Sequence, residues 1–407
     1  MHILYLSQYF PPEVGATQAR AYEMARYLVE QGHNVTMISE IPNHPSGVIP
    51  TTYQGKLFER VYLDGIYVIR LWVKTSTIKN FFSRMEFYLS YSFGSTIAGL
   101  LLRKEFDLIY ATSPPLFVGL AGLALSHLRR LPLFFEVRDL WPESAVALGE
   151  LRGSLAIRWA TRLEEACYHR ARRIVAVTAG IQDCLIERGI AAGKVVVVEN
   201  GANVNLFQFK PEMRQKIRQS LGMDGKFLVV YTGIIGLAQG LEVVLHAADL
   251  LKNNVSIQFL MIGEGPKKAE LLVMQQKLGL SNLQMLPEVP RHEVPDYLSA
   301  ADLALIPLRN KEVFHRVLPS KLLDAWACER AVLLGVDGEA RRLMESCTGG
   351  LFVPPEDAQA LSQAILELQV DESKRIAMGK RGREFTVAHF SRQALARKLE
   401  TILKNAT

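Results

Sequence analysis

A lysine and an aspartate three residues apart follow a strand-like segment in the C-terminal third of the chain. The segment 302–307 is mostly apolar, and Lys321 and Asp324 come after it, at the predicted start of a helix. A helix start offers free N–H groups and the positive end of its dipole to an anion. A carboxylate one turn further on can accept hydrogen bonds from two adjacent hydroxyls. This spacing therefore predicts a site for a phosphate joined to a ribose.

Two glycine-rich turns follow strand-like runs in the C-terminal half. Glycines let a backbone approach an anion closely, and a following helix start presents N–H groups to it, so the first turn suits a diphosphate; a tight strand-to-helix turn is the alternative. The second turn lacks the third glycine and the distant acidic residue of a dinucleotide fingerprint, so it does not predict NAD binding. The turn residues are Gly233, Gly236 and Gly240 in the first turn, and Gly263, Glu264 and Gly265 in the second.

Two polar segments follow strand-like runs in the N-terminal half. The segment 9–17 joins the first strand to the first helix, and Thr17 is equally suited to be the N-cap of that helix. The segment 136–144 gathers several charged residues around one tryptophan, which packing alone does not explain because buried charges need partners. The candidates in these segments are Glu13, Gly15, Thr17, Arg138, Asp139, Trp141 and Glu143.

Short apolar runs alternate with helical patterns along both halves of the chain. This alternation predicts parallel sheets with helical crossovers, interrupted by an Asp64-Gly65 hairpin signal. A length of 407 residues exceeds what one hydrophobic core usually holds. We therefore predict an α/β protein with two Rossmann-like, doubly wound parallel-sheet domains, over 1–205 and 206–385, and a final helical segment over 386–407.

Charge and cysteine usage narrow the function further. The net charge of +6 is spread over both halves without a basic tail or reader motif, so we predict no nucleic-acid partner. The four cysteines lie far apart and no Asp-x-Asp pair occurs, so we predict no metal site and a reducing compartment. The N-terminus lacks the features of a signal peptide, and we expect a cytoplasmic protein.

The predicted helix between Lys79 and Lys104 carries an apolar stripe. A core helix is one interpretation, and contact with a membrane surface is the other, favoured by basic residues near both ends. The charge-free run 108–128 is not a membrane span, because Pro114 and Pro115 divide it into a strand, a turn and a helix. The stripe consists of Phe81, Met85, Leu89, Phe93, Ile97 and Leu101, with Phe82 and Leu100 beside it, and the basic residues are Lys79, Arg84, Arg103 and Lys104.

Taken in order, these segments resemble the family-4 glycosyltransferases, and the resemblance spans essentially the whole chain. It implies the two-lobed GT-B fold with its active site between the lobes, retaining chemistry, and a terminal helix that returns to the N-terminal lobe. The segments that carry the resemblance are Pro11-Pro12-Glu13, Arg138–Glu143, Asn200-Gly201, Gly263–Pro266 and Pro319-Ser320-Lys321.

The resemblance is greatest to transferases of N-acetylated aminosugars in surface-polysaccharide assembly, such as O-antigen or capsule. It implies a nucleotide-sugar donor, linked to UDP, and a lipid-linked saccharide acceptor at the cytoplasmic face of the cell membrane. We expect no cofactor besides the nucleotide-sugar donor. The resemblance also implies that no strong side-chain base is needed, because in this family the leaving phosphate is thought to accept the proton of the acceptor. The oligomeric state is not predicted.

The resemblance also assigns roles to residues of this chain. The catalytic candidates are Arg138, Asp139, Glu143 and Lys321. The acceptor-binding candidates are Glu13, Arg138, Trp141 and Glu143. The donor-binding candidates are Gly15, Thr17, Gly233, Gly236, Gly240, Gly263, Glu264, Gly265, Val289, Arg316, Ser320, Lys321 and Asp324.

The chain departs from the family pattern at three places of the donor site. Ile234 and Gln239 stand where many relatives carry an Arg and a Lys, and Arg316 stands where they carry a Glu. The charge of the donor must then be met elsewhere, and Lys321 and Arg316 are the candidates. These departures leave open a catalytically silent binding subunit, and the shared fold leaves open a non-hydrolysing UDP-sugar 2-epimerase.

Overall fold

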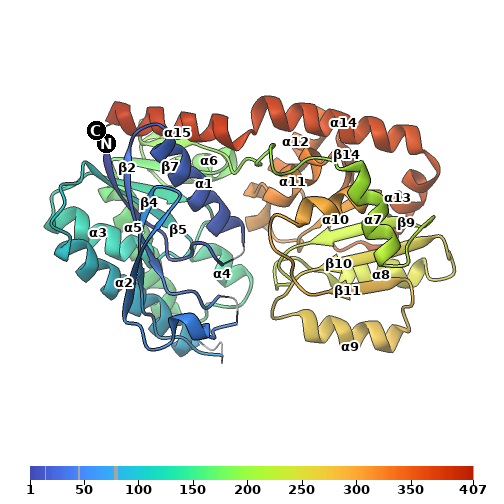
Figure 1. Ribbon diagram of the computed structural model, residues 1–407, viewed down its shortest axis with the longest axis horizontal. Helices are drawn as coiled ribbons and strands as arrows, with labels where there is room; N and C mark the ends of the chain where they lie inside the picture. Colours follow the sequence, from blue (N-terminus) through green and yellow to red (C-terminus); the bar gives the residue numbers. More distant parts are fainter. Residues whose placement is uncertain (14, 45, 78–80, 407) are drawn as a thin grey trace. The chain divides into compact units, whose positions relative to one another are not determined.

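The computed structural model describes all residues except 14, 45, 78–80 and 407, and it contains two compact units (Figure 1). The first unit comprises Met1–Glu199 together with Gln393–Thr407, and the second comprises Asn200–Arg392. Each unit is an α/β domain built on a mainly parallel sheet, which confirms the predicted fold class.

The sheet of the first unit has eight strands in the order β3-β4-β2-β1-β5-β6-β7-β8, and all pairs are parallel except β3 with β4. Asp64 and Gly65 both have positive φ at the turn between β3 and β4, as a two-residue hairpin requires. The strands are β1 (His2–Leu6), β2 (Asn34–Glu40), β3 (Phe58–Leu63), β4 (Ile66–Leu71), β5 (Leu108–Ser113), β6 (Leu133–Val137), β7 (Arg173–Ala176) and β8 (Val195–Val197).

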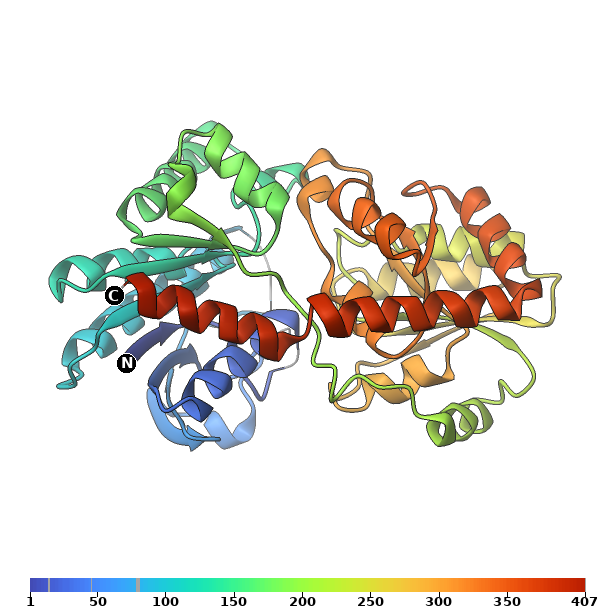
Figure 2. The same ribbon diagram turned by 90° about the horizontal axis from the view of Figure 1, so that it is seen from above.

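Helices cover both faces of this sheet. The C-terminal helix lies on the same face as α1, where Leu395, Leu399 and Leu403 join the buried cluster, and His33 pairs with Glu400 at 2.9 Å (Figures 1 and 2). The helices are α1 (Ala16–Glu30), α2 (Phe81–Leu101), α3 (Val118–Leu128), α4 (Glu143–Ala147), α5 (Ser154–Arg170), α6 (Ala179–Glu187) and α15 (Arg392–Ala406).

The second unit has a six-stranded, fully parallel sheet in the order β11-β10-β9-β12-β13-β14. The strand order reverses between β9 and β12, and in such sheets the ligand lies beyond the carboxyl ends of the strands at this point. The strands are β9 (Phe227–Thr232), β10 (Ile257–Ile262), β11 (Leu283–Leu286), β12 (Leu303–Pro307), β13 (Ala331–Gly335) and β14 (Gly350–Phe352). The helices are α7 (Pro211–Ser220), α8 (Glu242–Leu250), α9 (Lys268–Leu278), α10 (Val294–Ala300), α11 (Ser320–Ala327), α12 (Glu339–Cys347), α13 (Ala358–Val370) and α14 (Glu372–His389).

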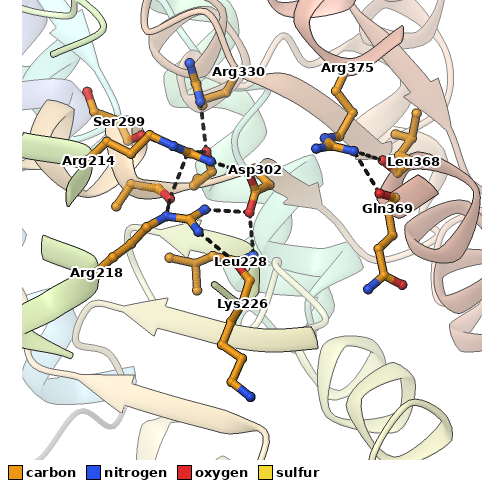
Figure 3. A network of polar contacts seen from close by, with 12 residues as sticks. Arg214, Arg218, Lys226, Leu228, Ser299, Asp302, Arg330, Leu368, Gln369 and Arg375 are labelled. Atoms are coloured by element: carbon orange, nitrogen blue, oxygen red, sulfur yellow. Dashed lines mark hydrogen bonds and ion pairs between the residues drawn. The ribbon is translucent and has the colours of Figure 1, made fainter. Parts of the chain in front are cut away.

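A charged cluster at the amino end of β12 fixes α7 to this sheet (Figure 3). The two carboxylate oxygens of Asp302 each accept from one arginine of α7, Arg214 and Arg218, at 2.5 Å, and one of them also accepts from the Leu228 N–H at 2.8 Å. The arginines hold the pKa of Asp302 below its usual value although burial opposes this. Because the ligand end of the sheet is the opposite end of β12, we interpret this cluster as structural.

The chain passes between the units at positions that differ slightly from the predicted boundaries near 205 and 385. The Ala202 N–H donates to the Phe390 carbonyl at 2.8 Å, and the Arg392 N–H donates to the Ala202 carbonyl at 2.9 Å. Phe207 is buried in the second unit beside Trp326. These contacts tie 200–207 to the second unit, and they place the end of α14 there as well, so only α15 returns to the first unit.

Helix α2 presents much of its apolar stripe to solvent. Tyr91 and Ser95 form its buried face instead, whereas Phe82 and Phe93 are 77% and 71% exposed. The core-helix interpretation therefore does not hold for most of the described stripe residues, although Met85 is half-buried. Lys79 and the side chain of Phe81 lie outside the described part of the chain. No helix in the described residues is long and apolar enough to cross a bilayer.

Candidate functional site

The strongest candidate site lies where β9 and β12 end in the second unit. Two loops leave the sheet here: the glycine turn that follows β9, and the segment after β12 that leads to α11. Helix α11 begins at Ser320, directly after Pro319, so its free N–H groups lie at the predicted lysine and aspartate. The structure thus places the phosphate-and-ribose candidates at the switch point of the sheet.

Lys321 bridges α11 and the glycine turn. Its ammonium group donates to the Tyr231 phenol oxygen at 2.5 Å and lies 4.3 Å from the centre of the Tyr231 ring. Burial lowers the pKa of Lys321 to about 7, against the opposing effect of the Asp324 carboxylate. A side chain at Gly233 would place its Cβ 2.3 Å from Lys321 Cε, and the positive φ of Gly233 also favours glycine. The turn is therefore built around this lysine.

Asp324 lies one turn further along α11 and is 8% exposed. Arg291, from the loop before α10, approaches its carboxylate at 3.8 Å and lies over the ring of Phe207 at 4.9 Å. Val289 is half-buried two residues before Arg291, and Arg316 is half-buried at the end of the 3-10 turn Glu312–Arg316. The carboxylate of Asp324 therefore lies near the loop that carries Val289, another donor-binding candidate.

The two glycine turns pack backbone against backbone. The Ile235 N–H donates to the Glu264 carbonyl at 2.8 Å. A Cβ on Gly263 would lie 1.9 Å from the Gly233 carbonyl oxygen, and one on Gly265 would lie 2.3 Å from the Ile235 carbonyl oxygen. These glycines are thus required by the contact between the turns, whether or not a phosphate also approaches them.

The side chain of Glu264 has a structural partner. Its carboxylate accepts from Lys268 at 2.6 Å, and the same ammonium donates to the carbonyls of Gly263 and Leu286 at 3.0 Å. The Glu264 carboxylate is therefore already paired, and any contact that it makes with the donor must be made in addition to the ion pair with Lys268. Lys268 also joins the second turn to the end of β11 through the Leu286 carbonyl.

Arg309, which the sequence did not single out, fixes the first turn. Its N–H donates to the Ala238 carbonyl at 2.8 Å, and its guanidinium donates to the Leu237 carbonyl at 2.8 Å and to Glu242 at 2.7 Å. Gln239 closes the turn by accepting from the Gly236 N–H at 3.1 Å. Arg309 could have been identified from its position in the sequence, because it comes two residues after β12, at the ligand end of the sheet.

The acceptor candidates lie in the first unit, after β6. Asp139 accepts from the Ser144 hydroxyl at 2.8 Å, and burial raises its pKa. Arg138 and Trp141 are half-buried, and Glu143 is exposed at the start of α4. Arg138, Asp139, Trp141 and Glu143 lie together because they are neighbours in the sequence. Of these four residues, only Glu143 is exposed.

Glu136, which ends β6 just before these residues, belongs to the core. Its carboxylate accepts from Arg20 at 2.9 Å and from the hydroxyls of Tyr110 and Thr112 at 2.6 Å. Arg20 lowers the pKa of Glu136 although burial opposes this. We therefore interpret Glu136 and its three partners as structural: they stabilise the end of β6, from which the chain continues into the segment 138–144.

Glu13 is buried, and its carboxylate joins its own loop to the segment that follows β2. One carboxylate oxygen accepts from the N–H groups of Asn43 and His44 at 2.8 Å, and burial raises the pKa of Glu13 to about 7. Glu40, another buried carboxyl whose pKa is raised, accepts from Gln8 and Asn43 at 2.7 and 2.9 Å. The sequence analysis did not single out Glu40, which lies at the end of β2, although the charge of Glu13 contributes to its raised pKa.

Gly15, not Thr17, caps the first helix. Helix α1 begins at Ala16 after Gly15, and the Gly15 carbonyl accepts from the Ala19 N–H at 3.0 Å. The N-cap interpretation of Thr17 is therefore wrong, because the helix starts two residues earlier than that role requires. Within the described residues, no group of three or more His, Cys, Asp or Glu side chains could hold a metal ion.

Comparisons with known proteins match both parts of the chain to glycosyltransferases. Residues 15–201 match the family described as glycosyl transferase 4-like domain, and residues 213–385 match glycosyl transferases group 1. The colanic acid biosynthesis glycosyl transferase WcaI of Escherichia coli is 28% identical over 379 residues, 90% of this chain and 91% of its own length. The glycosyltransferase WbjE of Pseudomonas aeruginosa is 26% identical over 57% of this chain and 58% of its own length.

Solved structures share the fold at lower identity. HepE of Anabaena, in complex with UDP and glucose, superimposes with a TM-score of 0.74 at 20% identity over 99% of both chains. WaaG, a glycosyltransferase of lipopolysaccharide biosynthesis, superimposes with a TM-score of 0.72 at 16% identity over 98% of this chain and 99% of its own. With two family matches that together span most of its length, the chain belongs to the family-4 glycosyltransferases of the GT-B fold.

Proposed function

We propose that this glycosyltransferase moves an N-acetylated aminosugar from a UDP-sugar to a lipid-linked saccharide, with retention of configuration, in surface-polysaccharide biosynthesis. The observation that carries the donor assignment is Lys321, held between Tyr231 and Gly233 at the start of α11. The names of the relatives support the pathway, since WcaI is named for colanic acid biosynthesis and HepE was crystallised with UDP and glucose.

The donor diphosphate fits the free N–H groups at the start of α11 and the ammonium of Lys321. A dianionic diphosphate next to Lys321 would favour its charged form, so binding should raise the pKa from its value of about 7. During transfer the bond from the sugar C1 to the phosphate oxygen breaks and negative charge grows on that oxygen. The helix dipole and the lysine stabilise this charge most in the transition state, as catalysis requires.

The ribose is assigned to Asp324, whose carboxylate is one turn beyond the phosphate site. Two charge-assisted hydrogen bonds from the ribose hydroxyls would suit a mostly buried carboxylate. Arg291 limits the charge cost of that burial. Arg316, at the end of the preceding 3-10 turn, is a second candidate cation for the diphosphate or the sugar.

The acceptor is assigned to the segment after β6 in the first unit. Glu143 is exposed at the start of α4, and Asp139 keeps a raised pKa behind it. We propose that these carboxyls orient the acceptor hydroxyl while the leaving phosphate oxygen takes its proton. No metal ion is needed in this scheme, because the lysine and the helix start supply the positive charge.

The decisive experiment is a panel of UDP-sugars incubated with lipid-linked saccharide acceptors, with and without a chelator. Release of UDP together with a new glycoside, unchanged by the chelator, is the expected result. Conversion of the UDP-sugar to an epimer would indicate a 2-epimerase, and the absence of any turnover across the panel would favour a silent binding subunit. NMR of the product anomeric proton would contradict retention if the configuration were inverted.

A further inference from the structure

An apolar cavity of about 530 Å³ lies within the first unit, among α2, α3 and α5. This volume is within the range of roughly 300–1,000 Å³ typical of small-molecule pockets. Met85 lines it from α2, Leu120 from α3, and Ala156 and Trp159 from α5. The cavity is therefore large enough for an apolar ligand, and neither the donor site nor the reaction itself uses it.

The cavity opens onto exposed apolar side chains. Trp159 is 67% exposed although it also lines the cavity, and a tryptophan in this position is unusual for a soluble surface. Phe82 and Leu89 are exposed one turn before and one turn after Met85 on α2. Exposed apolar side chains on α2 thus lie next to the cavity lining, beside the ion pair of Arg84 with Glu150 at 2.9 Å.

Trp141 connects the cavity with the candidate acceptor segment. It lines the cavity and stands between Asp139 and Glu143, the two carboxyls assigned to the acceptor hydroxyl. Its ring packs edge-on against Phe117 at 5.8 Å. A molecule with an apolar chain in the cavity and a saccharide near Glu143 would therefore pass over Trp141.

The lining of the cavity also carries a positive charge. Arg162 is the charged residue among the described residues that line it, and its guanidinium lies 5.6 Å from the centre of the Trp159 ring. Arg158, one turn earlier on α5, is exposed as well. An apolar cavity with a cation at its edge fits an apolar chain that ends in an anion, and a neutral chain or a flat protein surface would not use this charge.

We propose that this cavity binds the first isoprenoid units of a polyprenyl diphosphate, with Arg162 beside the diphosphate and the attached saccharide directed past Trp141. The proposal rests on the proposed function, because it specifies how the lipid-linked acceptor is held. The concave shape favours a single chain over a flat bilayer surface, which would contact the exposed side chains of α2 without filling the cavity.

The test measures binding of farnesyl diphosphate to the full-length protein by calorimetry, with the donor site saturated by UDP. Farnesyl diphosphate should bind, and inorganic diphosphate at the same concentration should not. Ala156→Trp fills the cavity and should weaken binding about tenfold or more, because excluding even two methylene groups has this effect. Ala166→Trp, the same change on an exposed part of α5, is the matched control and should bind as the wild type does.

Two further variants separate the two parts of the ligand. Arg162→Gln should weaken farnesyl diphosphate but leave farnesol unchanged, since only the diphosphate needs the charge. Trp159→Ala should weaken the binding of both ligands. Because Trp159 is largely exposed, the variant should still fold, and an unchanged melting temperature would show that it does. Equal affinity for farnesyl and inorganic diphosphate, or equal effects of Ala156→Trp and Ala166→Trp, would overturn the proposal.

The result also distinguishes this proposal from the proposed function. Farnesyl diphosphate binding that depends on Ala156, without sugar transfer to any acceptor, would leave the cavity assigned and the function wrong. Equal transfer to a lipid-linked saccharide and to its methyl glycoside, in both the wild type and Ala156→Trp, would confirm the function and overturn the cavity. Loss of vesicle binding alone in Ala156→Trp would show a bilayer contact and also overturn it.

Discussion

The half-buried side chain of Lys321, whose pKa is lowered to about 7, should make donor binding depend on pH. Its pKa is lowered to about 7 in the free protein, whereas a bound diphosphate should raise it well above that value. Below pH 7 the free site already holds the proton, so affinity should stay level. Above pH 7 each donor that binds must take up a proton, so affinity should fall about tenfold for each pH unit until the pKa of the complex is reached.

The assay is calorimetric titration with a UDP-sugar at several pH values between about 6 and 9. A UDP-sugar is preferred to UDP because its diphosphate has no terminal phosphate that titrates near neutrality. Lys321→Met keeps the length of the side chain but removes the charge, and it should bind weakly with a level profile. Uridine carries no phosphate, so its affinity should neither depend on pH nor fall in Lys321→Met.

The same lysine gives a prediction for stability with the opposite sign. The unfolded chain keeps the pKa of lysine near ~10.4, so between about pH 7 and that value the unfolded state binds the additional proton. The free energy of unfolding should therefore rise with pH across this window in the wild type. Lys321→Met should lose this rise in urea unfolding while remaining at least as stable at pH 7, since it removes a charge whose burial is costly.

A pH-independent affinity of the wild type for the UDP-sugar would refute this reasoning. So would equal losses of uridine and UDP-sugar binding in Lys321→Met, because the lysine would then act on the whole loop rather than on the diphosphate. A melting temperature well below that of the wild type would show that the contact with Tyr231 stabilises the fold, in place of the donor role assigned here.

Three further changes test other parts of the structure. Asp324→Ala should weaken UDP binding by about 10- to 100-fold, the loss of roughly 1.5–3 kcal/mol of charge-assisted hydrogen bonding, with little change in melting temperature; unchanged calorimetric affinity would remove Asp324 from the site. Asp302→Asn should do the reverse, lowering the free energy of unfolding by about 3 kcal/mol because two arginines lose their carboxylate, while UDP affinity stays as in the wild type. Phe82→Ser with Phe93→Ser should reduce sedimentation with anionic vesicles at low salt and leave the melting temperature nearly unchanged, since both side chains are largely exposed; a large fall in melting temperature would instead assign them to packing.

The sequence was sufficient for the general architecture because the signals are local. Alternating strands and helices determine a parallel α/β class, and the Asp64-Gly65 turn has the positive φ angles that its residues favour. Lys321 and Asp324 of the proposed donor site were predicted for the same reason. Both lie within one turn of a helix start that its own sequence defines.

What the sequence could not predict are contacts between residues far apart in the chain. Arg309 donates to the Leu237 carbonyl, 72 residues earlier in the chain, and the carboxyl of Glu40 at the end of β2 interacts with that of Glu13 in the loop after β1. The role of Gly263 is likewise visible only where the second turn touches the first. None of these pairs has a spacing that a strand or helix period would reveal.

Burial was the other property that only the tertiary structure decided. The apolar stripe of α2 has the periodicity of a core face, yet Phe93 is exposed and Tyr91 is buried, because the neighbouring sheet and α3 determine which side of the helix is covered. The pKa of Lys321 and the cavity beside Trp141 depend in the same way on what surrounds them. Local sequence specifies which residues are available, whereas packing determines which of them are desolvated, paired or left open to a ligand.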